Sequence, residues 1–183
     1  MDSVLLGSKA VYASSELTSG RRAQRLQQEH NVPNHVSLRD GLGPDHYHTL
    51  LWSLNVAEAV RFAEELRTRL GGAAVVISPA PFAAPSWPQS AYLAFWENVI
   101  RTRITAVYFN DGWEYSTGCV FEFAISTEVG LPTFDRAARQ LLVSEASQSV
   151  RHAITEMQAN RLETSAIRAS LDRLEQAASS SSR

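Results

Sequence analysis

The sequence predicts an α/β protein, with a parallel sheet joined by crossover helices and a helical C-terminal extension. Short apolar segments alternate with longer segments in which apolar residues recur at helical spacing. Turn residues end each short segment and separate it from the helix that follows. This alternation is typical of a parallel sheet, because parallel neighbours need a long and usually helical connection.

The N-terminal part contains one predicted strand, one predicted helix and a polar insertion. Residues 10–14 form the strand, which ends in a turn rich in Ser, Thr and Gly. A short helix is expected over 21–29, followed by a loop to about residue 48 that Pro and Gly residues interrupt. We therefore assign the polar segment of about 18–48 to an insertion that precedes the next regular helix.

The central part supplies the second strand and two helices. Apolar residues recur at helical spacing over 50–70, and a pair of glycines ends this helix. Residues 73–77 form a β-branched buried strand that Ser and Pro terminate. A Pro-rich loop then leads to Trp87-Pro88, where proline suits the first position of a helix with aromatic residues on one face.

The third predicted strand leads directly into the most informative stretch of the chain. The strand covers 104–109, and a small turn over 116–118 precedes a helix over 119–129 that Gly and Pro end. Glu122 therefore falls in the first turn of a helix that starts at the carboxyl end of a strand. In open α/β sheets this edge is where ligands bind.

The surroundings of Glu122 suggest a chemically useful carboxylate. Its sequence neighbours over 120–125 are otherwise apolar, so the carboxylate is expected to be partly desolvated and its pKa raised. Such a group can serve as a nucleophile or general base. The alternative is an acid placed near a helix N-terminus because the macrodipole favours it there.

The C-terminal part is expected to be helical. No Gly or Pro occurs from 136 to about 178, and apolar residues form two staggered stripes, over 150–157 and 167–178. This indicates two helices or one interrupted helix. Exposed stripes usually mark contacts, so they pack on their own α/β domain or on a second copy, and we expect a homodimer or higher homo-oligomer. The serine-rich segment 179–183 is predicted to be disordered.

The composition excludes several classes of protein. With 44% hydrophobic and 20% charged residues, the 183-residue chain is typical of a soluble globular protein. A net charge of −2 leaves no basic stripe for nucleic acid, and the single cysteine excludes an internal disulfide and a cysteine-rich zinc site. We see no membrane-spanning run and no signal pattern. A cytoplasmic protein without cofactor, metal, nucleic-acid or membrane partner is therefore expected.

Several short motifs occur in a defined order. The main one follows the third predicted strand and consists of Gly112-Trp113-Glu114, Ser116, Gly118, Glu122, Ala124 and Gly130-Leu131-Pro132. Two weaker motifs lie at 11–20 and 76–79. Together they resemble the nucleoside 2-deoxyribosyltransferase-like superfamily, particularly its small bacterial and phage branch. The resemblance covers roughly 10–20 and 50–135, and it implies a flavodoxin-like or Rossmann-like domain over 1–135.

The resemblance also implies an activity. In the better-known members a helix-start Glu, which Glu122 matches, attacks the anomeric carbon of a nucleoside and releases the base. Water or a second base then attacks the glycosyl-enzyme. A carboxylate suits this reaction because the transition state is oxocarbenium-like. The implied function is an N-glycosidase or deoxyribosyltransferase acting on a nucleoside or nucleoside 5′-monophosphate. A non-catalytic nucleotide-binding or sensor module of the same fold is the alternative. A third class is a helical interaction protein that works through residues 136–178, with the α/β part as a scaffold.

Two departures from the family pattern bear on the site. The deoxyribosyltransferases proper carry an Asp six residues before the Glu, where this chain has Ser116, as its branch does. The nearest acids are Asp111 and Glu114, either of which could do the acid work. The Gly-Pro of the first turn is replaced by Ser15-Glu16, which places an acidic side chain near the proposed phosphate site.

We assign candidate roles on this basis. The catalytic candidates are Glu122, Ser116 and Asp111. The substrate-binding candidates are Tyr12 (sugar), Ser14, Ser15, Gly20 and Arg21 (5′-phosphate), Trp87 and Trp113 (base stacking), and Gly118. The alternative for the predicted phosphate-binding residues is a solvated turn. The alternative for each Trp is packing in the core or anchoring of a loop.

Two further features have non-catalytic explanations. The segment 46–48, His-Tyr-His, suggests a metal or an acid/base pair, but no carboxylate at a suitable spacing supports it, so a solvated lid is expected. Cys119 lies at a helix start, where a thiolate is favoured. Without a histidine to activate it, Cys119 is expected to be a packed small residue.

Overall fold

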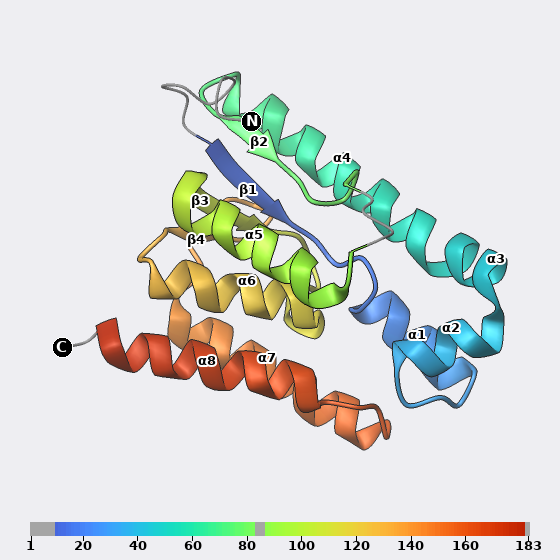
Figure 1. The fold of residues 1–183 in the computed structure, drawn as a ribbon. Coiled ribbons are helices and arrows are strands. Elements are labelled where there is room, and N and C mark those ends of the chain that lie inside the picture. Colours follow the sequence, from blue (N-terminus) through green and yellow to red (C-terminus); the bar gives the residue numbers. More distant parts are fainter. Residues whose placement is uncertain (1–9, 83–86, 182–183) are drawn as a thin grey trace.

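The computed structural model describes residues 10–82 and 87–181, which are built around a four-stranded sheet (Figure 1). The strands are β1 (Ala10–Ser14), β2 (Val75–Ile77), β3 (Ile104–Phe109) and β4 (Thr133–Phe134). They lie in the order β2-β1-β3-β4, and every pairing is parallel. The predicted α/β class is confirmed, and the strand order is that of a flavodoxin-like or Rossmann-like sheet.

The predicted strands agree with the structure except at the two edges of the sheet. The first and third match the predicted ranges, while β2 is two residues shorter than predicted. Strand β4 was not predicted, because a two-residue strand is too short to show an alternating pattern. It follows the glycine and proline that end the preceding helix.

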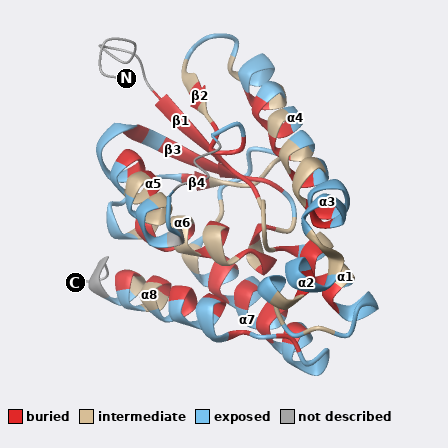
Figure 2. Cartoon of the chain, turned by 45° about the vertical axis from the view of Figure 1, so that its right-hand side comes forward, coloured by how far each residue is buried: buried red, intermediate tan, exposed pale blue. Residues whose placement is uncertain are grey.

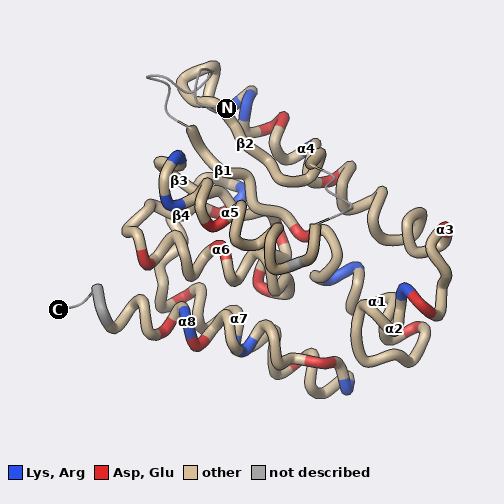
Figure 3. The backbone as a smooth tube through the Cα atoms, viewed as in Figure 1, with Lys and Arg blue, Asp and Glu red and all other residues tan. Residues whose placement is uncertain are grey.

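Helices connect and cover the strands. They are α1 (Arg21–Glu29), α2 (His35–Leu42), α3 (Pro44–Tyr47), α4 (Ser53–Leu70), α5 (Gln89–Arg103), α6 (Thr117–Glu128), α7 (Val143–Ala159) and α8 (Ser165–Ser181). A π-helical turn over His48–Trp52 leads into α4, and a 3₁₀ turn over Trp113–Tyr115 leads into α6. Charged residues of both signs lie interspersed along these helices (Figure 3).

The predicted loop before residue 48 is wrong, because most of it is helical. Asn34 caps α2 by accepting a hydrogen bond from the backbone N–H of Ser37 at 2.9 Å, and Pro44 occupies the first turn of α3. The Pro and Gly residues that indicated a loop thus lie at helix ends. Leu38, Tyr47 and other buried residues form a small cluster of their own. Helices α1–α3 lie beyond the carboxyl ends of the strands (Figure 1).

The two faces of the sheet are covered by different helices. The connection from β1 to β2 and that from β2 to β3 run in opposite directions across the sheet, so right-handed crossovers place α4 and α5 on opposite faces. Side chains of β1 alternate accordingly: Val11 and Ala13 pack in the cluster with α4, and Tyr12 packs in the cluster with α5 and α6. Figure 2 shows β1 and β3 as buried strands between these layers.

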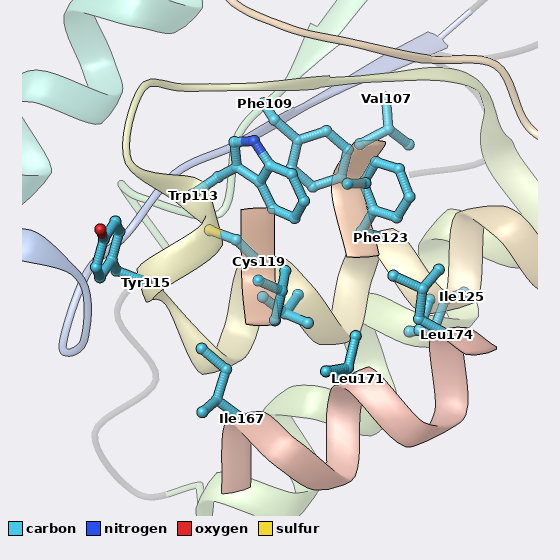
Figure 4. Packing of buried hydrophobic residues seen from close by; sticks show 14 of the residues in the cluster. Val107, Phe109, Trp113, Tyr115, Cys119, Phe123, Ile125, Ile167, Leu171 and Leu174 are labelled. Carbon is cyan, nitrogen blue, oxygen red and sulfur yellow. The ribbon is translucent and has the colours of Figure 1, made fainter. Parts of the chain in front are cut away.

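The C-terminal extension forms a further layer outside α6. Residues 160–164 interrupt it, and Arg161 there has a positive φ of 59°. The apolar stripes of α7 and α8 are buried in the same cluster as Phe123 and Ile125 of α6 (Figure 4). The stripes therefore pack on their own α/β domain and no longer provide an argument for a dimer.

Two further expectations concern the chain end and membranes. The predicted disordered tail over 179–183 is wrong for 179–181, which continue α8, while 182–183 lie outside the described residues. Within residues 10–82 and 87–181, no helix combines the length and the apolar character that crossing a membrane requires.

Candidate functional site

The candidate site lies where the carboxyl ends of β1 and β3 meet. Ser14 pairs with Phe109 at the end of the two strands. From β1 the chain crosses to β2 on one side, whereas from β3 it crosses to β4 on the other. This is the topological switch point of the sheet, the position at which open α/β sheets bind ligands.

Glu122 is held at this point by two hydroxyl groups. Tyr12 Oη donates a hydrogen bond to Glu122 Oε1 at 2.7 Å, and Ser14 Oγ donates one to Oε2 at 2.6 Å. Successive side chains of a strand alternate between faces, so Tyr12 and Ser14, two residues apart, both face α6. The two donors are fully buried, and Glu122 is partly buried.

The pKa of Glu122 is the clearest electrostatic feature of the site. Burial raises it from 4.5 to about 7, although the hydrogen bonds from Ser14 and Tyr12 favour the charged form. Burial, followed by the charge of Glu122, raises the pKa of Tyr12 well above its usual value, so Tyr12 remains a donor. Near neutral pH the Glu122 carboxyl group can therefore exchange a proton, which suits a general acid or base, and above pH 7 it is mostly the carboxylate that a nucleophile requires.

The position of Glu122 in α6 differs from the predicted one. The helix begins at Thr117, with Ser116 as its N-cap, so Glu122 lies in the second turn and not the first. The effect of the macrodipole falls off within the first turn. The partners of the carboxylate are hydroxyl groups of β1. A macrodipole-favoured acid at the helix start is therefore a poor explanation for Glu122.

The other two catalytic candidates do not join Glu122. The Ser116 hydroxyl caps α6 by accepting from the Cys119 N–H at 3.4 Å, and it lies 3.0 Å from Ser19 Oγ. The Asp111 side chain is 80% exposed and pairs with Arg136 at 3.6 Å. None of the contacts within the described ranges joins either residue to the Glu122 carboxylate. Of the three catalytic candidates, only Glu122 therefore lies at the centre of the site.

The predicted phosphate-binding residues do not converge on one site. Ser14 is engaged with Glu122, and the buried Ser15 hydroxyl has no hydrogen-bond partner. Gly20 is the N-cap of α1. The Arg21 guanidinium lies 4.1 Å from the centre of the Tyr115 ring and pairs with Glu114 at 3.3 Å. Gly118, also predicted to bind substrate, lies in the first turn of α6.

The two base-stacking candidates have different positions. Trp113 is only 7% exposed and stacks on Phe123 with ring centres 5.0 Å apart, so it is part of the core and the prediction for it is wrong (Figure 4). Trp87 is 44% exposed and meets Phe95 edge-on at 5.5 Å. Trp87 therefore has an aromatic surface free to contact a ligand.

An aromatic row on α5 was not predicted to belong to the site. Phe95 contacts Trp96 at 5.0 Å, and Trp96 contacts Tyr12 at 5.7 Å. The charge of Glu122 contributes to raising the pKa of Tyr92, which places this phenol within electrostatic reach of the carboxylate. Three aromatic residues within five positions of α5 could have indicated this part of the site. A helix that packs in a core has the same pattern, so the sequence did not distinguish the two.

Two surface hollows lie beside the site, and neither is lined by Glu122. One, of about 600 Å³, lies between the 3₁₀ turn and α7 and includes Arg21 and His152. The other, of about 510 Å³, is lined by Glu16, Gly112 and residues of α1. Both are open and are lined by charged side chains of both signs.

The remaining candidates behave as packed or solvated residues. Burial raises the pKa of the Cys119 thiol, which keeps it protonated and unreactive. His46 and His48 are exposed, and His48 Nδ1 lies 3.2 Å from Ser53 Oγ. In the part of the chain that the structure describes, no three His, Cys, Asp or Glu residues form a group that could hold a metal ion.

No family model matches the sequence, and no curated protein or solved structure is significantly similar to it. The fold and the side chains at the sheet edge define the class: an α/β protein with a partly buried carboxylic acid at the switch point of a parallel sheet.

The raised pKa of Glu122 has a testable consequence for stability. The folded state binds this proton more tightly than the unfolded state, so stability falls as pH rises from 4.5 to 7, and the cost persists above pH 7. We expect Glu122→Gln to stabilise the protein by about 1–3 kcal/mol at pH 8 and to change little at pH 5.

Urea unfolding of both proteins at pH 5 and pH 8 measures this difference. Glu64→Gln, an exposed acid on α4, serves as the control and should have little effect at either pH. A loss of about 0.3–1 kcal/mol in Glu122→Gln at pH 8 would instead indicate an acid that stabilises the helix start.

Proposed function

We propose that the protein is an enzyme that cleaves the N-glycosidic bond of a nucleoside or nucleoside 5′-monophosphate, as an N-glycosidase or deoxyribosyltransferase. The supporting observation is the Glu122 carboxyl group held between the Tyr12 and Ser14 hydroxyls at the switch point of the sheet. The substrate class rests on the resemblance of the motif over 112–132. Exposed aromatic surface at Trp87 and Phe82 is chemically suited to a base.

The proposed reaction has two steps. A Glu122 oxygen bonds to the anomeric carbon while the carbon–nitrogen bond breaks, and the bonding electron pair leaves with the base, which takes up a proton. Water or a second base then attacks the same carbon and releases the carboxylate. The two hydroxyl donors orient the carboxylate before the attack and stabilise the negative charge that returns to it.

The direct test is to incubate the protein with a panel of nucleosides and their 5′-monophosphates and to measure free base by chromatography. Mass spectrometry of the intact protein would detect a glycosyl adduct. Base release with at least one substrate is expected. If no substrate of the panel gives free base or a glycosyl adduct, the proposed activity is refuted.

A second candidate is a non-catalytic nucleotide-binding or sensor module. It is favoured by the absence, among the described contacts, of a second carboxylate beside Glu122: Ser116 replaces the family Asp, and Asp111 pairs with Arg136. This candidate predicts saturable binding of a nucleoside or nucleotide without base release.

The two hydroxyl donors provide a pH-dependent prediction. A nucleophilic Glu122 must be ionised, so kcat/KM should rise through pH 7 and level off above it. Tyr12→Phe removes a hydrogen-bond donor that lowers the pKa of Glu122, so the rise of kcat/KM with pH should move to higher pH. Ser14→Ala should act in the same direction.

The measurement is kcat/KM from pH 5.5 to 9. Tyr47→Phe, a substitution in the separate cluster near α3, is the control and should leave this rise in place. An unchanged rise in both Tyr12→Phe and Ser14→Ala would show that Glu122 does not control the profile.

A further inference from the structure

The loop between β1 and α1 turns the side chain of Glu16 onto the N-terminus of α1. Glu16 Oε2 accepts a hydrogen bond from the backbone N–H of Arg21 at 3.0 Å, and the backbone N–H of Arg22 also donates to the carboxylate. These two residues open α1, whose first N–H groups have no partner within the helix. A carboxylate of the chain itself therefore occupies the position in which helix N-termini bind anions.

Gly20 makes room for this carboxylate. It has a φ of +105°, and a Cβ there would lie 1.8 Å from Glu16 Oε2, so the Glu16 side chain would have to move. On the other side, a Cβ on Gly112 would lie 3.6 Å from the same oxygen, an ordinary contact distance. The Glu16 carboxylate thus lies between the backbone segments of Gly20 and Gly112.

Two arginines follow Glu16 at the start of α1. The Arg22 guanidinium is close enough to lower the pKa of Glu16, although burial, the largest effect, raises it to about 7. The Arg21 guanidinium points instead to Glu114 and the Tyr115 ring. The Arg21 guanidinium is therefore engaged away from the N-terminus of α1, whereas the charge of Arg22 acts on Glu16 and its buried Nε has no hydrogen-bond partner.

Glu16 and Glu122 belong to one site. They are placed through the same strand end, since Tyr12 and Ser14 hold Glu122 and Glu16 follows two residues later. The same loop contacts the helix of Glu122 directly: Ser19 Oγ lies 3.0 Å from the Oγ of Ser116, the N-cap of α6. The loop that carries Glu16 therefore borders the Glu122 site.

We propose that Glu16 is a specificity-determining residue that selects nucleosides with a free 5′-hydroxyl group over nucleoside 5′-monophosphates. The carboxylate occupies the helix N-terminus that a phosphate would need, and a phosphate placed beside it would meet a like charge at short range. A neutral hydroxyl group carries no such penalty and can donate a hydrogen bond to the carboxylate. This inference rests on the proposed function for its substrate class.

The test measures binding by calorimetry at pH 8, where Glu16 is mostly ionised. The ligands are the four common 2′-deoxynucleosides, their 5′-monophosphates and inorganic phosphate. Wild type should bind a nucleoside at least about tenfold more tightly than its monophosphate and should not bind phosphate measurably, since one like-charge contact near a surface is worth a factor of this order. Glu16→Ala should reverse the preference and gain phosphate binding.

Two further variants separate charge, space and location. Glu16→Gln removes the charge but retains the volume, so it should reduce the preference without reversing it. Glu29→Gln is the matched control: it removes an exposed acid at the opposite end of α1, and it should leave the preference unchanged. Circular dichroism verifies that each variant is folded, and Glu16→Gln tests the proposal if Glu16→Ala does not fold.

The outcomes distinguish this inference from the proposed function. A wild-type protein that binds monophosphates as tightly as nucleosides would overturn the selection by Glu16, as would an unchanged ratio in Glu16→Ala and Glu16→Gln. A different outcome is that Glu16→Ala gains inorganic phosphate binding while no variant binds a nucleoside. This would support the occupation of the α1 N-terminus by Glu16 and would refute a nucleoside as the substrate.

Discussion

Glu122→Gln is expected to reduce base release by on the order of 10⁴-fold or more, because an amide cannot form the bond to the anomeric carbon. Glutamine has nearly the same volume, and the Tyr12 and Ser14 hydroxyls can still contact its oxygen and nitrogen atoms. The fold should therefore remain intact. Initial rates of base release at pH 8, together with circular dichroism spectra, measure both effects.

The comparison needs a control that changes a glutamate without changing the site. Glu64→Gln on α4 lies on the opposite face of the sheet and should retain wild-type activity. Equal activity of Glu122→Gln and wild type would remove this carboxylate from the mechanism. If neither protein has activity, nucleoside binding by both would favour the non-catalytic module.

Leu174→Ala is expected to cost about 2–5 kcal/mol of stability, which corresponds to a decrease in melting temperature of roughly 4–20 °C. Leu174 is fully buried, and Figure 4 shows it beside Ile125 of α6. Truncating it leaves a cavity between α8 and α6. Asp172→Ala, an exposed position on the same helix, should change stability by less than about 0.5 kcal/mol.

Thermal unfolding at about 1 and about 100 µM protein would also show whether the apolar stripe of α8 packs within one chain or between two copies. An intramolecular contact gives the same loss at both concentrations, whereas an interface between copies makes the melting temperature depend on concentration. A concentration-dependent loss would contradict the packing of α8 on its own α/β domain.

Local patterns were sufficient for much of the fold. The strands at 10–14 and 104–109 and the helix at 21–29 follow from apolar runs and turn residues that lie next to one another in the chain. They failed where the signals were ambiguous. Pro44 and Gly43 indicated a loop, but the same residues are favoured at helix ends, and only the packing of α2 and α3 decided between the two.

The sequence by itself determined that Glu122 lies on an apolar helix after a strand, and that an acid, Glu16, lies in the turn after the first strand. Tertiary structure decided what these acids contact. Tyr12 and Ser14 lie 110 and 108 positions from Glu122 in the chain. Trp113, a predicted base-stacking residue, packs on Phe123 in the core. Such pairings depend on strand order and register, which bring together residues whose local sequences contain no information about each other.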